Sequence, residues 1–225
     1  MKKAVILFSG GLDSTTCFAI AREQHFACYP LSFDYDQNNK IELMAAKNIA
    51  SILGAVEHKI LPLPMGMLGG SALTDPEIKI PDYDPANTRI PVTYVPARNT
   101  IFLAFALSYA EVIGAYDIFI GVNALDYSGY PDCRQPFISS FEKLANVATS
   151  AGALGNHFHI HTPLITLSKA DIIKKGLALG LDYSATISCY RVDTEGRACG
   201  TCDSCCFRKK GFQEAAAIDP THYAF

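Results

Sequence analysis

The 225-residue chain has no stretch long enough to cross a membrane. Its longest apolar run, residues 101–107, ends at Ser108, whereas a membrane-spanning helix needs about 20 apolar residues. A secretory leader is not expected either, because Lys2 and Lys3 are followed by only five apolar residues before Ser9. We therefore expect a cytoplasmic protein with no membrane partner.

Basic residues are too few and too scattered for a surface that binds a long polyanion. The formal net charge is −3, and the one short basic run, residues 208–210, is interpreted as solvated surface. Proteins that bind duplex or transfer RNA usually present a basic face, so no nucleic-acid partner is expected. Contents of 49% hydrophobic and 18% charged residues are typical of a folded enzyme.

The common nucleotide-binding motifs GxxxxGK[ST] and GxGxxG are also missing. Instead, residues 4–8 form an apolar run that predicts a buried strand, and a helical pattern continues from Cys17. Between them, Gly10 and Gly11 can adopt positive φ, and Asp13 and Ser14 are suitable N-cap residues. Because a helix N-terminus attracts anions, this segment is either a phosphate site or an ordinary turn between strand and helix.

The string SGGLDS at residues 9–14 resembles the SGGxDS signature of the PP-loop ATP pyrophosphatases. These enzymes split ATP between its α- and β-phosphates and adenylate a carboxylate or carbonyl oxygen. The resemblance favours the phosphate site and implies that the loop holds pyrophosphate, with Ser9, Asp13 and Ser14 as catalytic residues. The expected ATP-binding residues are Phe8, Ser9, Gly10, Gly11, Leu12, Asp13, Ser14, Thr15 and Thr16.

Strand and helix patterns alternate along the rest of the chain, which predicts an α/β fold with a doubly wound, mostly parallel sheet. We expect a Rossmann-like, adenine nucleotide alpha hydrolase-like domain at residues 1–185 and a small zinc-binding segment at residues 186–225. The last predicted helix of the larger domain begins at Ser168, with Asp171 three residues later as in a capping box. Predicted strands cover residues 27–33, 56–61, 117–122 and 158–161, and predicted helices cover residues 41–53, 101–113, 137–151 and 168–179.

A proline-rich stretch at residues 62–95 interrupts this alternation and is either a lid over the substrate or a passive surface loop. Arg98 and Asn99 follow it, near the predicted start of a helix. An arginine in a first helical turn opposes the helix dipole. We expect Arg98 to contact a phosphate or a substrate carboxylate and to act as an electrostatic catalyst, and a surface salt bridge is the alternative.

The loop at residues 123–134 carries more polar and aromatic side chains than a turn requires. Its tyrosines can stack on a planar heterocycle and its carboxylates can accept from ring N–H groups, although structural packing of the tyrosines would fit equally well. The candidate substrate-binding residues are Arg98, Asn99, Asn123, Asp126, Tyr127, Tyr130 and Asp132. Three alternating histidines at 157, 159 and 161 are interpreted as solvent-facing strand residues rather than metal ligands.

Five of the eight cysteines lie between residues 189 and 206, which favours a metal site over disulfides in a cytosolic protein. Cys189, Cys199, Cys202 and Cys205 have the spacing C-x9-C-x2-C-x2-C. Four thiolates close a tetrahedral shell around Zn²⁺ and leave no open position, so the predicted zinc is structural. A redox-active C-x2-C pair is the disfavoured alternative, and Cys206 is expected to lie outside the cluster.

Six segments together make the chain similar to the 7-cyano-7-deazaguanine synthase family of queuosine biosynthesis. One departure is visible, because residues 36–39 read DQNN where this family usually has GQRH. That change puts phosphate or substrate contacts of the segment in doubt. The matching segments are SGGLDSTT at 9–16, FDYDQ at 33–37, VPARN at 95–99, GVNALDYSGYPDCR at 121–134, TPLITLSKADII at 162–173 and SCYR…ACGTCDSCCFRKKGF at 188–212.

The resemblance implies a ligase that converts 7-carboxy-7-deazaguanine, ammonium and ATP to 7-cyano-7-deazaguanine (preQ0) through an adenylated carboxylate and an adenylated amide. Mg²⁺ would bridge the β- and γ-phosphates, and the family is commonly homodimeric. Asp126 or Asp132 is a candidate base for ammonium. Two rival hypotheses are a PP-loop enzyme that thiolates tRNA, which would need a basic face and a persulfide cysteine, and a zinc module that binds nucleic acid.

Overall fold

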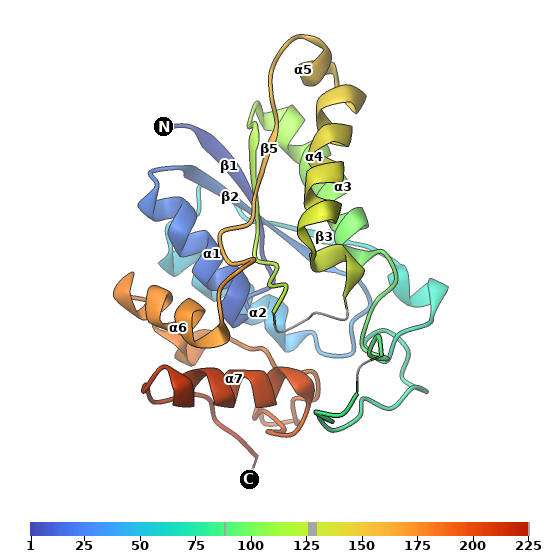
Figure 1. Ribbon diagram of the computed structural model, residues 1–225, viewed down its shortest axis with the longest axis vertical. Coiled ribbons are helices and arrows are strands. Elements are labelled where there is room, and N and C mark those ends of the chain that lie inside the picture. The colour runs from blue at the N-terminus through green and yellow to red at the C-terminus, as the bar shows by residue number, and fades with distance from the viewer. Residues whose placement is uncertain (88, 126–129, 225) are drawn as a thin grey trace.

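The computed structural model describes residues 1–87, 89–125 and 130–224. Within these residues the chain alternates strands and helices from the N-terminus to α6, and a last helix follows (Figure 1). The strands are β1 (Lys3–Leu7), β2 (Ala27–Asp34), β3 (Lys59–Pro62), β4 (Asp117–Ile120) and β5 (His159–His161). The helices are α1 (Leu12–Glu23), α2 (Ile41–Ile52), α3 (Arg98–Ile113), α4 (Gln135–Ala148), α5 (Ser150–Ala153), α6 (Lys169–Ala178) and α7 (Asp203–Glu214).

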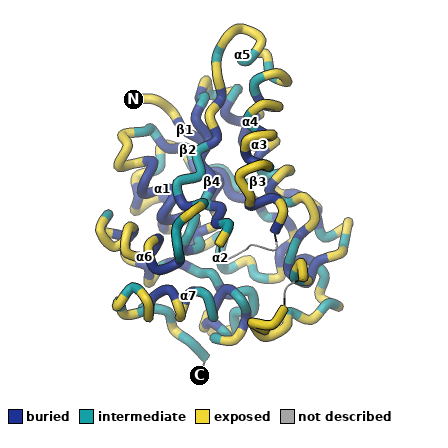
Figure 2. The backbone as a smooth tube through the Cα atoms, viewed as in Figure 1, coloured by how far each residue is buried: buried dark blue, intermediate teal, exposed yellow. Residues whose placement is uncertain are grey.

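The five strands form one sheet of order β3-β2-β1-β4-β5, and all four neighbouring pairs are parallel. Successive side chains of a strand point to opposite faces, so Val5 and Leu7 pack with α3 and α4, whereas Ala4 and Ile6 pack with α1, α2 and α6. Figure 2 shows the buried strands between these two layers. The predicted doubly wound parallel sheet is confirmed.

Several predicted boundaries were wrong. Helix α1 begins at Leu12 with Gly11 as its N-cap, so Asp13 and Ser14 lie inside the first turn instead of capping it. The ladder of β3 with β2 starts at Lys59 rather than at residue 56. The predicted helix at 137–151 is divided into α4 and α5. By contrast, the Ser168 cap of α6 is confirmed, because its hydroxyl accepts from the Asp171 N–H at 3.1 Å.

The C-terminal segment contains a helix that the sequence pattern did not predict. Helix α7 lies along α6 (Figure 1) and its Phe212 is buried in the same core cluster as α1 and α6. The close approach depends on Gly211, because a Cβ at this position would lie 2.3 Å from the Cγ of Lys169. The interpretation of residues 208–210 as solvated surface is wrong for Arg208. This residue is 3% exposed, and its Nε lies 3.0 Å from Asp219 Oδ1.

The proline-rich segment after β3 is attached to the body at several points. Ala72 N donates to Val92 O at 2.8 Å, and Tyr83 N donates to Thr201 O of the C-terminal segment at 2.8 Å. Leu73 and Val95 are buried in the core cluster of α3. No helix among the described ranges is long and apolar enough to span a membrane.

Candidate active site

A cavity of about 240 Å³ opens at the carboxyl ends of β1, β2 and β4. The ends of β1 and β4 are level, because Leu7 pairs with Ile120, whereas β2 continues from Leu31, the other partner of Leu7, to Asp34. From β1 the chain first adds β2 and β3 on one side of the sheet, and later β4 and β5 on the other side. The carboxyl end of β1 is therefore the switch point of the sheet, where open α/β sheets bind ligands. The cavity walls come from residues 7–9, 11–14, 37–39, 42–43, 98–99, 120–123 and 187–190, together with Phe33, Tyr35, Leu73, Phe102, Tyr130, Cys133 and Ser204.

The loop after β1 is shaped by two glycines with different tasks. Gly10 has φ +82°, and a Cβ there would lie 2.7 Å from Ala46 N and 2.9 Å from Glu42 O, so this glycine lets the loop pack on α2. Gly11 has φ −79° and lines the cavity. The expectation that both glycines use positive φ is therefore wrong for Gly11.

Three serine hydroxyls surround the start of α1. Ser9 Oγ and Ser14 Oγ are 3.1 Å apart, and the Gly11 N–H donates to Ser9 Oγ at 3.3 Å. The Leu12 N–H donates to Ser188 Oγ, also at 3.3 Å. Ser188, which the sequence pattern did not indicate, brings the C-terminal segment directly onto the first turn of α1. These N–H groups and hydroxyls form a set of donors suited to phosphate oxygens.

The two threonines of the expected ATP site do not line the cavity. Thr15 and Thr16 are 1% and 0% exposed, and Thr16 Oγ1 bonds Leu12 O at 2.9 Å and Tyr183 OH at 2.7 Å. The Thr16 hydroxyl is thus on the side of α1 that faces the core, and Thr15 Oγ1 is buried without a hydrogen bond among the described residues. Phe8 and Leu12, by contrast, lie in the cavity wall.

Asp13 is held by a lysine that lies 156 residues away in the sequence. Lys169 Nζ donates to the two carboxylate oxygens of Asp13 at 2.7 and 2.8 Å, and its side chain is 8% exposed. The stem of Lys169 is fixed under Gly211 of α7. The TLSKADI segment carries this lysine, but no spacing in the sequence indicates that it reaches Asp13.

Arg98, the first residue of α3, lies in the cavity wall. Its guanidinium carbon is 5.8 Å from the ring centre of Tyr35 and 5.9 Å from that of Phe102. Burial lowers the pKa of Arg98, but the phenol groups of Tyr35 and Tyr130 outweigh it, so the pKa rises and the group stays cationic. No carboxylate among the described residues forms an ion pair with it, so the alternative of a surface salt bridge is not found there.

The predicted substrate loop is only partly seen, because Asp126 and Tyr127 lie outside the described residues. Tyr130 lines the cavity, and its OH is 2.9 Å from Thr93 Oγ1. Asn123 also lines the cavity, but its amide donates to Leu164 O and Leu167 O and so holds the β4 loop.

Asp132 is not among the residues that line the cavity. Its Oδ2 accepts the Asn99 N–H at 3.1 Å, and the Asn99 side chain donates to Asp132 O at 3.0 Å. The pair joins the start of α3 to the segment before α4. Asp132 therefore positions Asn99, and its roles as a ligand contact and as the base for ammonium stay predictions.

Glu42, in the first turn of α2, is a cavity residue that the sequence analysis did not select. Gln37 Nε2 donates to Glu42 Oε1 at 3.0 Å, while Gln37 Oε1 accepts the Tyr35 N–H at 2.7 Å. Burial raises the pKa of Glu42, while the hydrogen bond from Gln37 and the positive charge of Arg98 lower it. Burial has the larger effect, and the pKa is about 7. An acidic residue in the first turn of the helix that follows β2 was the signal that could have indicated it.

The unusual segment at residues 36–39 joins three parts of the chain. Asp36 has φ +62°, a conformation that glycine adopts more easily, and its Oδ2 accepts the Gly66 N–H at 3.2 Å. Asn38 donates to Ala72 O at 3.1 Å, and Asn39 donates to Cys189 O at 3.0 Å. These bonds tie the start of α2 to the proline-rich segment and to the cysteine cluster.

The four predicted metal ligands come together. The Sγ atoms of Cys189, Cys199, Cys202 and Cys205 all lie within 4.8 Å of one another. Backbone N–H groups point at the sulfurs, with Cys199 N 3.2 Å from Cys189 Sγ and Cys202 N 3.4 Å from Cys199 Sγ. Hydrogen bonds from Cys189 and Cys205 hold the pKa of Cys202 far below its usual value, which favours a thiolate. The donor set fits one tetrahedral zinc ion.

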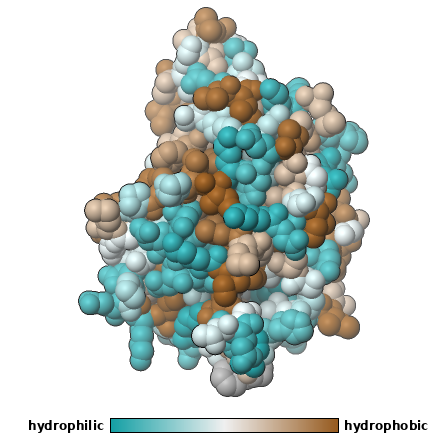
Figure 3. All heavy atoms as spheres, turned by 180° about the vertical axis from the view of Figure 1, so that it is seen from behind, coloured by the Kyte–Doolittle hydropathy of each residue, from teal (hydrophilic) through white to brown (hydrophobic). Residues whose placement is uncertain are grey.

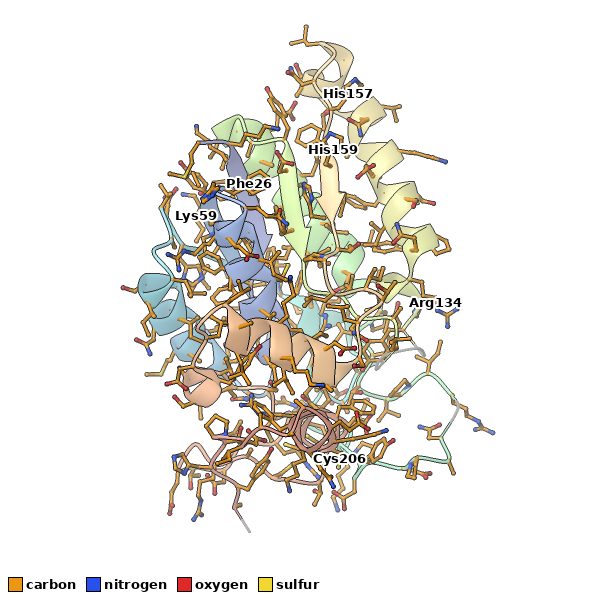
Figure 4. All side chains as sticks on the ribbon, turned by 60° about the vertical axis from the view of Figure 1, so that its left-hand side comes forward. Phe26, Lys59, Arg134, His157, His159 and Cys206 are labelled. Atoms are coloured by element: carbon orange, nitrogen blue, oxygen red, sulfur yellow. The ribbon has the colours of Figure 1, made fainter. Side chains whose placement is uncertain are left out.

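Other metal groupings are not found in the described part of the chain. Cys206 is not in the cluster, as expected, and its sulfur points toward Thr201 O at 3.6 Å. Figure 4 shows His157 and His159 near β5, at the opposite end of the molecule from Cys206. His161 Nε2 is 2.6 Å from Asp117 Oδ1, and its ring stacks on Phe119 at 4.3 Å.

A sequence profile described as "Queuosine biosynthesis protein QueC" matches residues 3–216. The chain belongs to the QueC family. Among its relatives, a "7-cyano-7-deazaguanine synthase" from Methylococcus capsulatus is 62% identical over 223 residues, covering 99% of each chain. One of the same name from Nitrosococcus oceani is 61% identical over 221 residues, covering 98% of each. The predicted family resemblance is confirmed.

Solved structures of lower identity share the fold of this QueC chain. An NMN synthetase from Francisella tularensis superposes with a TM-score of 0.51 at 15% identity and covers 97% of this chain and 79% of that one. A 4-thiouridine synthetase in complex with RNA and bound ATP gives a TM-score of 0.52 at 19% identity, covering 96% and 50%. At such identities the likeness shows the architecture alone.

Proposed function

We infer that the chain is a 7-cyano-7-deazaguanine synthase, an ATP-dependent ligase of queuosine biosynthesis that forms carbon–nitrogen bonds. The observation that carries this is full-length identity of about 60% to relatives of that name. The position of the cavity, next to a helix N-terminus and a cationic arginine, supports the same activity. The substrates would be 7-carboxy-7-deazaguanine, ATP and free ammonium.

The chemistry requires activation of a carboxylate, because ammonia does not displace hydroxide from it. Transfer of AMP to the carboxylate gives an acyl-adenylate, which ammonia converts to the amide. A second adenylation of the amide oxygen allows AMP to leave and the nitrile to form. The residues of the chain would act in this sequence by binding, orienting and moving protons.

We propose that the loop at residues 9–14 holds the pyrophosphate. Phosphate oxygens would take over the Gly11 and Leu12 N–H groups that now bond Ser9 and Ser188 over 3.3 Å. Lys169 fixes Asp13 at the edge of this loop. Arg98 would stabilise negative charge on the phosphates or on the substrate carboxylate.

The base of the substrate would occupy the part of the cavity opposite the loop. Asn99 and Tyr130 lie in its wall, and Phe102 adds an aromatic face against the stacked ring of Phe33 at 4.1 Å. A planar heterocycle fits such a wall because aromatic faces stack. Asp126 and Tyr127 stay candidates from the sequence.

Two metals belong to this proposal. Mg²⁺ takes most of its ligands from phosphate oxygens and water, in keeping with the described residues, where the cysteine cluster is the one grouping that could hold an ion by itself. When bound, Mg²⁺ would offset the charge of the departing pyrophosphate. One Zn²⁺ per chain would be held by the four cysteines and keep residues 187–190 in place as a cavity wall.

We further propose a division into a nucleotide-binding domain at residues 1–185 and a zinc-binding segment at 186–225, a cytoplasmic location and a homodimer. Support for the dimer comes from apolar side chains on the outer helices, where Val112 of α3 and Val147 of α4 are 80% and 81% exposed. Figure 3 shows apolar patches between polar side chains on the rear face.

The test is mass spectrometry of the purified protein with ATP, Mg²⁺, ammonium and 7-carboxy-7-deazaguanine. Formation of the nitrile together with AMP and pyrophosphate is the expected result. Consumption of ATP with neither amide nor nitrile would overturn the substrate assignment and leave a PP-loop enzyme that thiolates tRNA as the next hypothesis.

A further inference from the structure

The reaction sequence removes protons from nitrogen, and the structure offers few groups to receive them. Ammonia that attacks an acyl carbon becomes positively charged, and it must lose a proton to give a neutral amide. Among the described residues that line the cavity, the carboxylates are Asp13 and Glu42. Asp13 already binds the Lys169 ammonium through both oxygens.

Glu42, unlike Asp13, is not bound through both carboxylate oxygens. One carboxylate oxygen accepts from Gln37, and the structure shows no hydrogen bond or ion pair to the other among the described residues. Gln37 cannot turn away, because its oxygen accepts the Tyr35 N–H and its nitrogen also donates to Phe33 O at 3.3 Å. The amide is therefore fixed with its N–H toward Glu42, and the carboxylate is held in one orientation in the cavity wall.

We propose that Glu42 accepts the proton that the attacking nitrogen loses when ammonia displaces AMP from the acyl-adenylate. In this step the C–N bond forms and the C–O bond to AMP breaks, with its electron pair leaving on the phosphate oxygen. The N–H proton moves to the free oxygen of Glu42, which later returns it to water. The proposal rests on the proposed function, since it needs an acyl-adenylate and ammonia in this cavity.

The surroundings of Glu42 suit a group that gains and loses a proton near neutral pH. Tyr35 faces it from the end of β2 and Arg98 from the start of α3, and these with Gln37 are the polar groups that act on it. Tyr35 itself stays protonated, because burial raises its pKa to about 12. The Cys133 thiol also stays protonated, because burial raises its pKa to about 12.

The test separates the two half-reactions in Glu42→Gln, which keeps an acceptor for the Gln37 N–H. ATP–pyrophosphate exchange that depends on 7-carboxy-7-deazaguanine, measured without ammonium, should be unchanged, because adenylation of a carboxylate releases no N–H proton. Amide formation from the adenylate should slow about 100-fold, as for loss of a general base. With hydroxylamine as nucleophile the loss should be much smaller, since this weaker base gives up its proton to water more readily.

A pH profile adds a readout that a structural role would not move. With the rate expressed per concentration of free ammonia, the wild type should lose activity as the pH falls below about 7, and Glu42→Gln should lack this dependence. Glu111→Gln is the matched control, because Glu111 on α3 accepts the Ala151 N–H at 2.9 Å and does not line the cavity.

The outcomes distinguish the two claims. If Glu42→Gln lowers exchange as strongly as amide formation, Glu42 acts in binding or adenylation and the base assignment is overturned while the ligase function stands. If the wild type itself shows no exchange with 7-carboxy-7-deazaguanine, the proposed function fails first. An unchanged rate of amide formation in Glu42→Gln would also overturn the assignment.

Discussion

Alanine in place of Gly10 should lower the stability of the protein. Alanine in place of Gly11 should leave stability almost unchanged and lower the activity. Gly10 has φ +82°, where alanine is disfavoured by about 1 kcal/mol relative to glycine. In addition, its Cβ would meet backbone atoms of α2 at 2.7 and 2.9 Å. Backbone cannot rotate away as a side chain can, so α2 must shift, which costs about 1–3 kcal/mol.

The expected loss for Gly10→Ala is thus about 2–4 kcal/mol of unfolding free energy. With a urea dependence of about 2 kcal/mol per molar, the unfolding midpoint should fall by about 1–2 M. Gly114→Ala is the matched control, because Gly114 has φ +66° and ψ +37°, and a methyl group there would have no atom within 4 Å. This control variant should lose only the unfolding free energy that comes from backbone strain, which is about half of the loss in Gly10→Ala or less.

Gly11→Ala should fold almost normally. Its φ of −79° suits alanine, and the nearest atoms to a Cβ, Ile187 O and Ser9 Oγ, are 3.4 Å away. The methyl group would fill space beside the loop N–H groups, so ATP–pyrophosphate exchange should fall strongly. Two results would contradict these expectations: a Gly10→Ala variant that loses no more stability than Gly114→Ala, or a Gly11→Ala variant that keeps full exchange activity.

Three further predictions concern the metal, the buried ion pair and pH. Cys202→Ser should lower zinc content, measured by metal analysis, and increase hydrogen exchange in α7; full zinc content would contradict the four-cysteine site. Lys169→Met should destabilise the protein by about 2 kcal/mol in urea unfolding, because it leaves the Asp13 carboxylate without its partner; no loss would mean that solvent replaces the lysine. Because the folded pKa of Glu42 is raised from 4.5 to about 7, the folded state binds the proton more tightly and loses stability as the pH rises through this window. Glu42→Gln should therefore be more stable than wild type by about 3 kcal/mol at pH 8 and equal to it at pH 4, as measured by urea unfolding; a difference independent of pH would contradict the raised pKa.

The fold could be predicted because its signals are local. An apolar run followed by SGGLDS, and alternating strand and helix patterns, specify a parallel sheet with the ligand site at its carboxyl edge. The boundaries were less well determined. The start of α1 at Leu12 depends on contacts of Gly10 with α2 and of Leu12 with Ser188, and neither contact is visible in the local pattern.

The candidate site was predicted in part for the same reason. The four cysteines are spaced within one short segment, so spacing alone indicated a shared metal ion. Asp132 and Thr16 carry suitable groups in suitable segments, yet their hydrogen bonds go to Asn99 and Tyr183 instead of the cavity. Which side of an element faces the cavity is decided by packing against residues far away in the chain.

The strand–loop–helix start, the sheet type, the four-cysteine cluster and the family could all be predicted from the sequence, because each depends on residue types at short spacings. Three contacts became visible only in the folded chain: Lys169 binds Asp13, Ser188 meets the start of α1, and Gln37 orients Glu42 toward the cavity. Two of these contacts join residues more than 150 positions apart. They exist because the parallel sheet brings its carboxyl ends together and α7 packs the C-terminal segment against them.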